Sequence, residues 1–428
     1  DNHIRLCTKF THEFDRIQNA LARAYSLYSQ TESHVENLIS QLLTVFPFIG
    51  AFSIGARAAY HVSQHGLSSQ ALINTIEDTS MFQESLLRFL ALSAMPLQHS
   101  SIIQNPFAMK RARNHSQEPM PALTSLLAAG TAPFMNKAQG NNIELTQQTP
   151  SKPVVQEMGS MQDTISQLRR LSNQTYAHAS NETTGLSYGT IAIQRLQHFD
   201  NTQSWIVLIP GTDGMPDSPF GWPQNLELSS PAHQMNADSA RMVRYAMKQA
   251  GIQPYDNVTL VGHSQGGLVA ASIASGDHDF SIRHVITAGS PIANHRIPQH
   301  VQVTSIEMKT ELVHNLDAQP NPTHRENWVT IRGNTQKLSK PHTLSSSTPQ
   351  EQSYDKHSSH NRNTAYTTHV KDARAIELTH DLKYHEASFK NAQQIGSEKL
   401  RYQEEDFKQI HGNVKKIETT YWQGRMKR

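Results

Sequence analysis

Strands and helices alternate along the second half of the chain. Between about residues 186 and 335, short apolar runs recur, and amphipathic stretches of helical period separate them. The runs 205–209, 257–261 and 301–306 are apolar or β-branched, as buried strands are. This alternation predicts an α/β domain, with a mainly parallel sheet covered by helices on both faces.

Both ends of the chain show a helical period instead. Residues 10–42 carry apolar side chains at alternating spacings of four and three, the rhythm of a helix that packs along another helix. The most apolar stretch, 42–59, contains Pro47 and Arg57, which favours a buried or interfacial helical hairpin over a membrane span. Residues 386–428 are expected to form a C-terminal helix. Its apolar stripe consists of Phe407, Ile410, Val414, Ile417 and Tyr421.

These patterns divide the chain into four regions. We expect a helical region at 1–100, a polar linker at 101–180, the α/β domain at 181–385 and the C-terminal helix after it. The linker assignment depends on the proline, glutamine, serine and asparagine that interrupt the apolar period there. A further polar stretch, 335–375, is expected to be a long loop inside the α/β domain.

Composition excludes several classes of function. The chain has 38 basic and 36 acidic side chains, a net charge of +2, so charge gives no case for a nucleic-acid partner. Its 24 histidines are scattered, without a zinc-binding pattern, and a single cysteine, Cys7, excludes an internal disulfide framework. We therefore expect no metal and no organic cofactor.

The strongest chemical signal is the Gly-His-Ser-Gln-Gly motif at 262–266. It directly follows the apolar run 258–261 and opens an apolar stretch that favours a helix. A turn from strand to helix this tight requires the flanking glycines. It exposes the hydroxyl of Ser264 at the head of the helix, where the helix dipole favours negative charge. Strand, turn and helix together predict Ser264 as a nucleophile, with an ordinary turn and an incidental serine as the alternative.

A serine nucleophile that attacks a carbonyl also needs backbone N–H groups to bind the oxyanion. The first should come from Gln265, the residue after the nucleophile. The second should come from the loop that follows the strand 205–209, where the sequence reads Pro-Gly-Thr-Asp-Gly. We expect Thr212 to be that donor, with Asp213 as the next choice.

The remaining members of a triad should follow in the order acid, then histidine. Candidate acids after the strand 301–306 are Glu307, Glu311 and Asp317. The histidines further along are His314, His324, His342, His357, His360, His369, His380 and His385. Spacing alone does not choose among them.

Residues 186–390 resemble the α/β-hydrolases of actinobacterial type, which are related to lipase-like and esterase-like serine hydrolases. The matching stretches are Ile209-Pro-Gly-Thr, Gly262-His-Ser-Gln-Gly-Gly, Ala288-Gly-Ser-Pro-Ile, Glu311-Leu-Val-His-Asn-Leu-Asp317 and His380-Asp-Leu-Lys-Tyr384. In the family the fourth stretch begins with the aspartate of the triad, whereas this chain has Glu311, and His314 where proline is usual. The resemblance therefore implies Glu311 as the acid, with Asp317 as the alternative, and His380 as the catalytic histidine.

The same resemblance implies an α/β-hydrolase fold and hydrolysis of an ester or lipid through an acyl-enzyme on Ser264. Apolar residues of 42–59 and of the loop 215–222 are expected to bind a lipid acyl chain, with peripheral membrane contact. Two alternatives stay open. An acyltransferase would use the same triad, and a helical secretion or interaction protein would carry the domain in an inactive form.

The chain ends resemble, more loosely, the helical regions of type VII secretion effectors. Trp422-Gln-Gly424 matches the WxG tripeptide of that system, and Tyr402 to Asp406 match its YxxxD/E signal. Ordinary amphipathic helices explain these short motifs equally well. The resemblance implies a secretion-system partner and a secreted or cell-envelope location, and it leaves a cytoplasmic location open.

Overall fold

The structure is a computed structural model that describes residues 140–175, 184–221, 224–308, 311, 313–317, 319–335, 367–368 and 379–428. The expected helical region 1–100, with its hairpin at 42–59, lies outside the described residues. So does most of the polar stretch 335–375.

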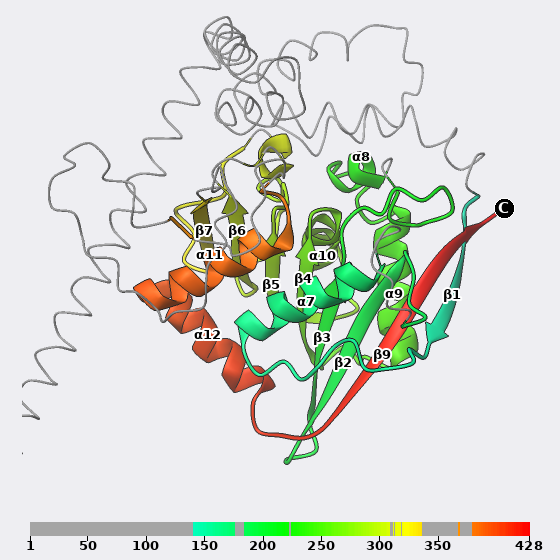
Figure 1. Cartoon of the computed structure of the whole chain (residues 1–428), viewed down its shortest axis with the longest axis horizontal. Helices are drawn as coiled ribbons and strands as arrows, with labels where there is room; N and C mark the ends of the chain where they lie inside the picture. Colours follow the sequence, from blue (N-terminus) through cyan, green and yellow to red (C-terminus); the bar gives the residue numbers. More distant parts are fainter. Residues whose placement is uncertain are drawn as a thin grey trace, which may run out of the picture.

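In the described part of the chain, nine strands form a single sheet in the order β1-β9-β2-β3-β4-β5-β6-β7-β8 (Figure 1). Their bounds are β1 Asn142–Gln148, β2 Thr190–His198, β3 Gln203–Ile209, β4 Asn257–His263, β5 Ser281–Ala288, β6 Gln302–Met308, β7 Trp328–Thr335, β8 Thr367–Thr368 and β9 Val414–Lys427. Neighbours run parallel from β3 to β8 and antiparallel from β1 through β9 and β2 to β3. This mainly parallel sheet confirms the predicted fold class.

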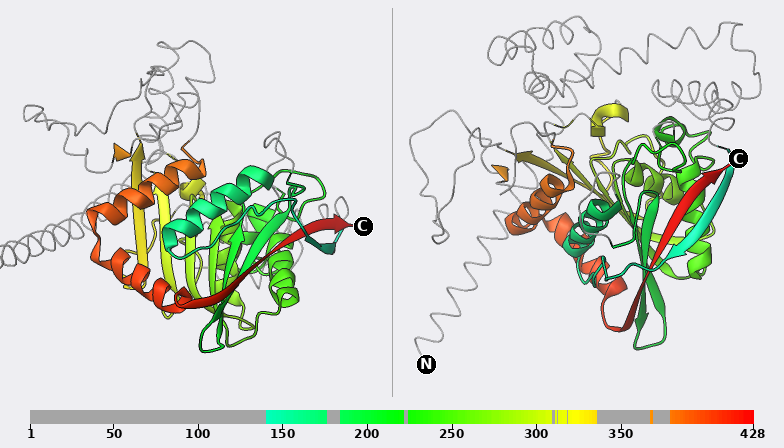
Figure 2. Two further views of the ribbon diagram at one scale, coloured as in Figure 1. Left: turned by 60° about the horizontal axis from the view of Figure 1, so that its bottom comes forward. Right: turned by 45° about the vertical axis from the view of Figure 1, so that its right-hand side comes forward.

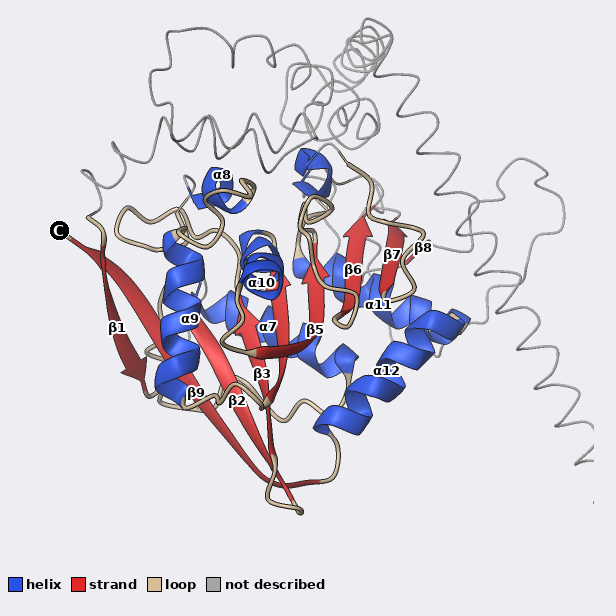
Figure 3. Ribbon diagram, turned by 180° about the vertical axis from the view of Figure 1, so that it is seen from behind, coloured by secondary structure: helices blue, strands red, loops and turns tan. Residues whose placement is uncertain are grey.

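Helices cover both faces of the sheet (Figures 1, 2 and 3). One face carries α7 (Met161–Thr175), α11 (Leu382–Ile395) and α12 (Glu398–His411), and the other carries α9 (Asp238–Ala250) and α10 (Gln265–Gly276). The short helix α8 (Gln224–Leu228) packs against α9 and α10. A short 3-10 helix, η2 (Val313–Asp317), follows β6. The strand β3 has apolar side chains on both faces of the sheet, so helices must bury both faces. Trp205 and Val207 pack with α9 and α10, whereas Ile206 and Leu208 pack with α7 and α12.

The expected single C-terminal helix at 386–428 is two helices up to His411, because α11 ends at Gly396 and α12 begins after Ser397. Beyond His411 the expectation is wrong. There α12 ends at Gly412, and Asn413, at a φ of 56°, turns the chain into β9. The predicted apolar stripe extends past Gly412, at which the helix ends. The β-branched and aromatic residues beyond this glycine favour a strand. The tripeptide Trp422–Gly424 therefore lies inside β9 and not in a helical turn.

The expected linker at 101–180 is also partly wrong, because the α/β domain begins earlier. Residues 142–148 form β1, which pairs with β9 in antiparallel register. This edge strand has no apolar run, since most of its side chains are exposed. The helix α7 buries Met161, Ile165 and Leu168, a helical period that the polar residues between them had obscured.

Three buried histidines make the fold sensitive to acid. Burial lowers the pKa of His284 and His411 to about 3 and that of His295 to about 4, from 6.5 in an exposed histidine. The folded values lie below the unfolded one, so the unfolded chain takes up more protons as the pH falls through 6.5. Each group then removes about 1.4 kcal/mol of stability per pH unit until its folded pKa is reached.

We therefore expect the free energy of unfolding to fall steeply between pH 6 and pH 5. In His284→Gln the slope against pH should be smaller than in the wild type by about one proton. Urea denaturation at several pH values measures both slopes. Parallel curves for the two proteins would contradict the assignment of a neutral His284 to the folded state.

None of the helices in the described ranges has the length and apolar content of a membrane span.

Candidate active site

The turn between β4 and α10 holds Ser264 in a strained conformation. Its φ is 53° and its ψ is −120°, a region that side chains rarely adopt. The flanking glycines leave the space for this turn. A Cβ on Gly262 would lie 2.3 Å from the backbone of Gly266, and a Cβ on Gly266 would lie 2.0 Å from the carbonyl oxygen of Ile209. The turn has the geometry expected of a nucleophile elbow, and Ser264 is the one residue of 261–270 that is partly exposed, whereas the others are buried.

The ends of β4, β5 and β6 bring the predicted residues together. The N–H of Ser264 donates to the carbonyl of Ala288 at 2.9 Å, and the N–H of Gly289 donates to Ile306 at 2.9 Å. A Cβ on Gly289 would lie 2.5 Å from Oε1 of Glu311 and 2.9 Å from Nδ1 of His380. Gly289, at a φ of 58°, therefore lies where the side chains of Glu311 and His380 meet.

The structure pairs His380 with Glu311 and places Asp317 elsewhere. Nδ1 of His380 forms a short hydrogen bond with Oε1 of Glu311, whose side chain is only 1% exposed. A carboxylate on Nδ1 leaves Nε2 of the same ring free to accept a proton. Asp317 instead accepts the N–H groups of Ala293, at 2.8 Å, and Gln319, at 3.2 Å. Of the two candidate acids, the geometry favours Glu311.

Electrostatics keep Glu311 ionised despite its burial. Burial alone would raise its pKa, but the neighbouring His380 and His385 outweigh this effect and hold the pKa well below its usual range. His314 lies on the same side, with Nδ1 at 3.8 Å from Oε2 of Glu311. Although burial opposes its charged form, the carboxylates of Glu307 and Glu311 raise the pKa of His314 to about 9. The acid therefore lies in a cationic environment.

His263, inside the motif at 262–266, holds the backbone that carries His380. Its Nε2–H donates to the carbonyl of His380 at 2.9 Å, and the two rings lie 4.6 Å apart. Burial lowers the pKa of His263 well below its usual value, so the ring is neutral. The sequence analysis gave this residue no role. Its only signal was a position next to Ser264.

The loop after β3 lies against Ser264, where an oxyanion-binding loop is expected. A Cβ on Gly211 would be 3.1 Å from Cβ of Ser264. Gln265 is the first residue of α10, and its side chain fixes the far end of the loop by donating to the carbonyl of Gly221 at 2.8 Å. The N–H of Asp213 is already bonded to Phe220 at 3.2 Å. Asp213 is thus the weaker choice, and Thr212 remains the candidate donor.

The carboxylate of Asp213 connects parts of this loop to one another and to Gly189 by hydrogen bonds. It accepts hydrogen bonds from the N–H of Gly189 at 2.9 Å, from the hydroxyl of Ser218 at 2.6 Å and from the N–H of Met215 at 3.0 Å. Burial raises its pKa. The carboxylate therefore holds the loop in its conformation through these three hydrogen bonds.

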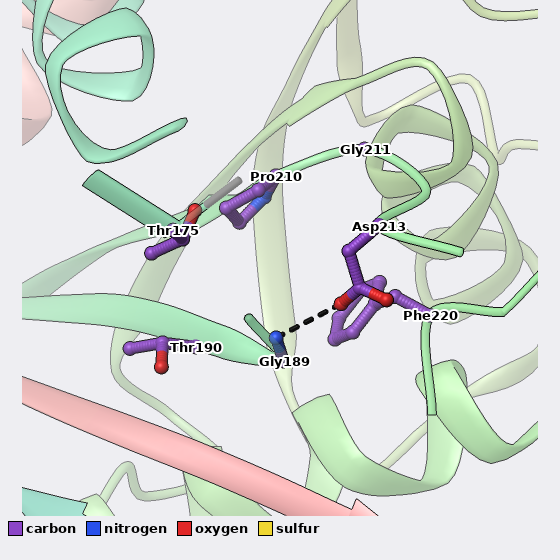
Figure 4. Close-up of a pocket in the computed structure, with 7 residues that line it drawn as sticks. All are labelled: Thr175, Gly189, Thr190, Pro210, Gly211, Asp213 and Phe220. Atoms are coloured by element: carbon purple, nitrogen blue, oxygen red, sulfur yellow. Dashed lines mark hydrogen bonds between the residues drawn. The ribbon is translucent and has the colours of Figure 1, made fainter. Parts of the chain in front are cut away.

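A small cavity of about 10 Å³ lies beneath the same loop (Figure 4). It is lined by Thr175, Gly189, Thr190, Pro210, Gly211, Asp213 and Phe220. A space of this size holds about one water molecule, so it is too small for a substrate. Phe220, in the loop that was expected to offer apolar surface, is only 2% exposed and packs into the core.

No group of three or more histidine, cysteine, aspartate or glutamate side chains in the described ranges is arranged to hold a metal ion.

Comparison with known proteins supports a hydrolase-type domain. A family model described as a PGAP1-like alpha/beta domain matches residues 232–391, a range that includes Ser264, Glu311 and His380. A comparison with curated proteins found no match, and neither did one with solved structures. The matched family and the mainly parallel sheet together show that the chain contains an α/β-hydrolase-type fold.

Proposed function

We propose that this protein is a serine hydrolase that cleaves carboxylic esters through an acyl-enzyme on Ser264. The proposal rests on the strained conformation of Ser264 at the head of α10, together with the short hydrogen bond between His380 and the buried Glu311. A strained backbone at a tight turn costs stability. Proteins retain such strain at functional sites, and in a nucleophile elbow it exposes the hydroxyl of the serine.

In the proposed mechanism Nε2 of His380 takes the proton of Ser264 as the hydroxyl oxygen attacks the ester carbonyl. Glu311 accepts the hydrogen bond from Nδ1 and stabilises the imidazolium that forms. His380 then gives its proton to the leaving alcohol, and Ser264 remains acylated. A water molecule, deprotonated by His380, attacks the acyl carbonyl, releases the carboxylic acid and restores the hydroxyl of Ser264.

The negative oxygen of each tetrahedral intermediate needs donors that are already in place. We assign this role to the backbone N–H groups of Gln265 and Thr212. The first N–H groups of a helix have no partner within the helix, and Gln265 begins α10. Thr212 directly follows Gly211, which lies against Ser264. Such donors typically contribute a factor of about 10²–10³ each to turnover.

A lipid substrate and peripheral membrane contact belong to the same proposal. Their main support in the sequence is the apolar stretch 42–59, which lies outside the described residues. The burial of Phe220 removes one of the residues that could have received an acyl chain. The ester chemistry itself depends only on described residues.

Labelling with a fluorophosphonate probe tests the proposal. The wild-type chain should be labelled, and mass spectrometry of peptides should place the label on Ser264. Ser264→Ala should abolish labelling, whereas Ser275→Ala, at the other end of α10, should retain it. A folded wild-type protein that takes up no label would favour the inactive secretion or interaction protein instead.

A further inference from the structure

A second cleft lies at the opposite end of the parallel strands from Ser264. It is found where β3 and β4 begin, whereas Ser264 follows the last residue of β4. The length of this strand, about 20 Å, separates the two places. We call it the amino-end cleft. Its walls are residues of the β2–β3 turn (198–203), of the loop before β4 (255–257) and of the α12–β9 connection (409–413), together with Arg283 and Asp406.

The amino-end cleft has the size of a ligand site and walls that hydrogen bonds hold together. Its volume is about 680 Å³, within the range of about 300–1,000 Å³ that such sites have. Nδ1 of His198 donates to the carbonyl of Gly412 at 2.9 Å, which ties the β2–β3 turn to the α12–β9 connection (Figure 1). Asp256 accepts the indole N–H of Trp205 at 2.8 Å. Walls fixed in this way lose little conformational entropy when a ligand binds.

The lining of the cleft is polar but carries no excess of positive charge. Among the described residues that line it, Ile410 has the one aliphatic side chain, so an acyl chain would bury polar groups without hydrogen bonds. The charged side chains are the carboxylates of Asp200, Asp256 and Asp406 and the guanidinium of Arg283. An anion such as phosphate would meet more negative than positive charge here. The lining therefore favours a polar ligand that is not an anion.

Side-chain amides are the commonest polar groups of this lining. There are five of them, on Asn201, Gln203, Asn257, Gln409 and Asn413. Within the described part of the chain, none of these amides forms a side-chain hydrogen bond. An amide both donates and accepts, so it can bind a hydroxyl group in either role. The cleft thus offers several free partners to a ligand with many hydroxyl groups.

Exposed aromatic rings accompany these amides. Tyr255 lines the cleft and is 79% exposed, and Phe199, in the β2–β3 turn, is 63% exposed. An exposed ring presents a flat apolar face next to the polar groups. A sugar ring has the matching surface, because its C–H groups can pack on an aromatic face while its hydroxyl groups reach the amides.

Asp406 adds an acceptor without a donor. Its Oδ2 is buried, and no described residue donates a hydrogen bond to it. Arg283 lies near enough to oppose the rise in the pKa of Asp406 that burial causes. A buried acceptor without a donor costs stability, and a ligand hydroxyl that donates to this carboxylate would offset the cost.

We propose that the amino-end cleft is a binding site for a neutral carbohydrate. Tyr255 packs against a sugar ring, and the amides bind its hydroxyl groups. The inference does not depend on the proposed function, because no residue of the cleft belongs to the candidate active site. Such a site would hold the domain on a glycan and leave Ser264, at the other end of the strands, unobstructed.

Saturation-transfer difference NMR with the full chain tests this proposal. The probes are neutral trisaccharides of glucose, of mannose, of galactose and of N-acetylglucosamine. At least one should bind, with an affinity that high salt leaves unchanged, since no charge pair is involved. Tyr255→Ala should weaken this binding by about tenfold or more. Tyr245→Ala, which removes a 43% exposed tyrosine of α9 outside the cleft, should bind as the wild type does.

Two further variants test the polar part of the cleft. Gln409→Ala removes an amide from the exposed surface of α12 and should weaken sugar binding several-fold. Asp406→Asn keeps an acceptor but removes the charge, so it should bind the sugar within a few-fold of the wild type. A hexalysine peptide provides the contrast, because its binding would depend on the charge of Asp406 and on salt.

The proposal is overturned if none of the trisaccharides binds, or if Tyr255→Ala binds them as tightly as the wild type. Salt-sensitive binding of hexalysine without binding of a sugar would make the cleft a site for basic peptides instead. Loss of sugar binding in Ser264→Ala would place the sugar at the candidate active site, which also contradicts the proposal. Fluorophosphonate labelling of Ser264 is independent of all these outcomes.

Discussion

Replacement of Glu311 by glutamine should lower kcat by about four orders of magnitude. The amide can no longer stabilise the charged ring of His380, and its NH₂ group can hold that ring in the wrong tautomer. Removal of the acid alone costs about this much in well-studied triads, less than removal of the serine or the histidine. KM should change little, because Glu311 is 1% exposed and lies behind the histidine.

Asp317→Asn is the matched control, since the sequence left both acids open. Asp317 accepts backbone N–H groups of Ala293 and Gln319, so the amide should cost some stability but change kcat no more than a few-fold. Steady-state kinetics with a p-nitrophenyl ester measures both variants. If Asp317→Asn were the inactive variant and Glu311→Gln the active one, the assignment of the acid would have to be reversed.

Replacement of Gly266 by alanine should destabilise the domain by at least about 4 kcal/mol, or prevent folding. The new Cβ would lie 2.0 Å from the carbonyl oxygen of Ile209 and 2.5 Å from that of Pro210. Both are backbone atoms, so no side-chain rotation relieves the clash. The helix α10 and the loop after β3 would have to separate, and the site lies between them.

Gly159→Ala serves as the control because its new Cβ would lie no closer than 3.9 Å to a neighbour. Its stability should stay within about 1 kcal/mol of the wild type, or increase slightly, as alanine restricts the unfolded chain. Thermal unfolding followed by circular dichroism measures both variants. A Gly266→Ala protein with the melting temperature of the wild type would show that the turn is less tight than the structure has it.

The sequence was most informative where both faces of a strand are buried. The strands β3 and β4 contain mainly apolar or β-branched residues, and such runs in alternation with helical stretches predict a parallel sheet. The nucleophile motif was equally clear, since it combines a strand, two glycines and a helix within a few residues. The pairing of Glu311 with His380 had to come from a resemblance, because 69 positions separate them.

The edges of the domain were harder to predict, for a physical reason. The edge strand β1 exposes most of its side chains and therefore lacks an apolar pattern. In β9, Val414, Ile417 and Tyr421 keep the spacing of a helix, whereas Gly412 and the β-branched and aromatic residues beyond it indicate the change to a strand. A single glycine of this kind decides between helix and strand. A hydrophobic period is judged over many residues, so one such position hardly changes it.

Within the candidate site, the sequence pointed to the proposed reacting residues but not to the residues packed around them. His385 was one of eight histidines without a distinguishing feature. Its place in the site follows from its contacts with the carbonyl of Asp381 and with Glu311, which lies 74 positions earlier. Gly289 matters because three side chains converge on it, and a sequence does not show such convergence. Contacts between distant segments are the part of the site that only the fold reveals.

The position of β9 between β1 and β2 sets the order in which the domain can form during synthesis. Every strand from β2 to β8 is made before residues 414–427 leave the ribosome, yet β2 needs β9 as its neighbour. Until then the backbone groups along one side of β2 have no partner, and such an edge invites pairing with another chain. The nascent domain therefore depends on its last strand, or on a chaperone that covers the gap, to avoid aggregation.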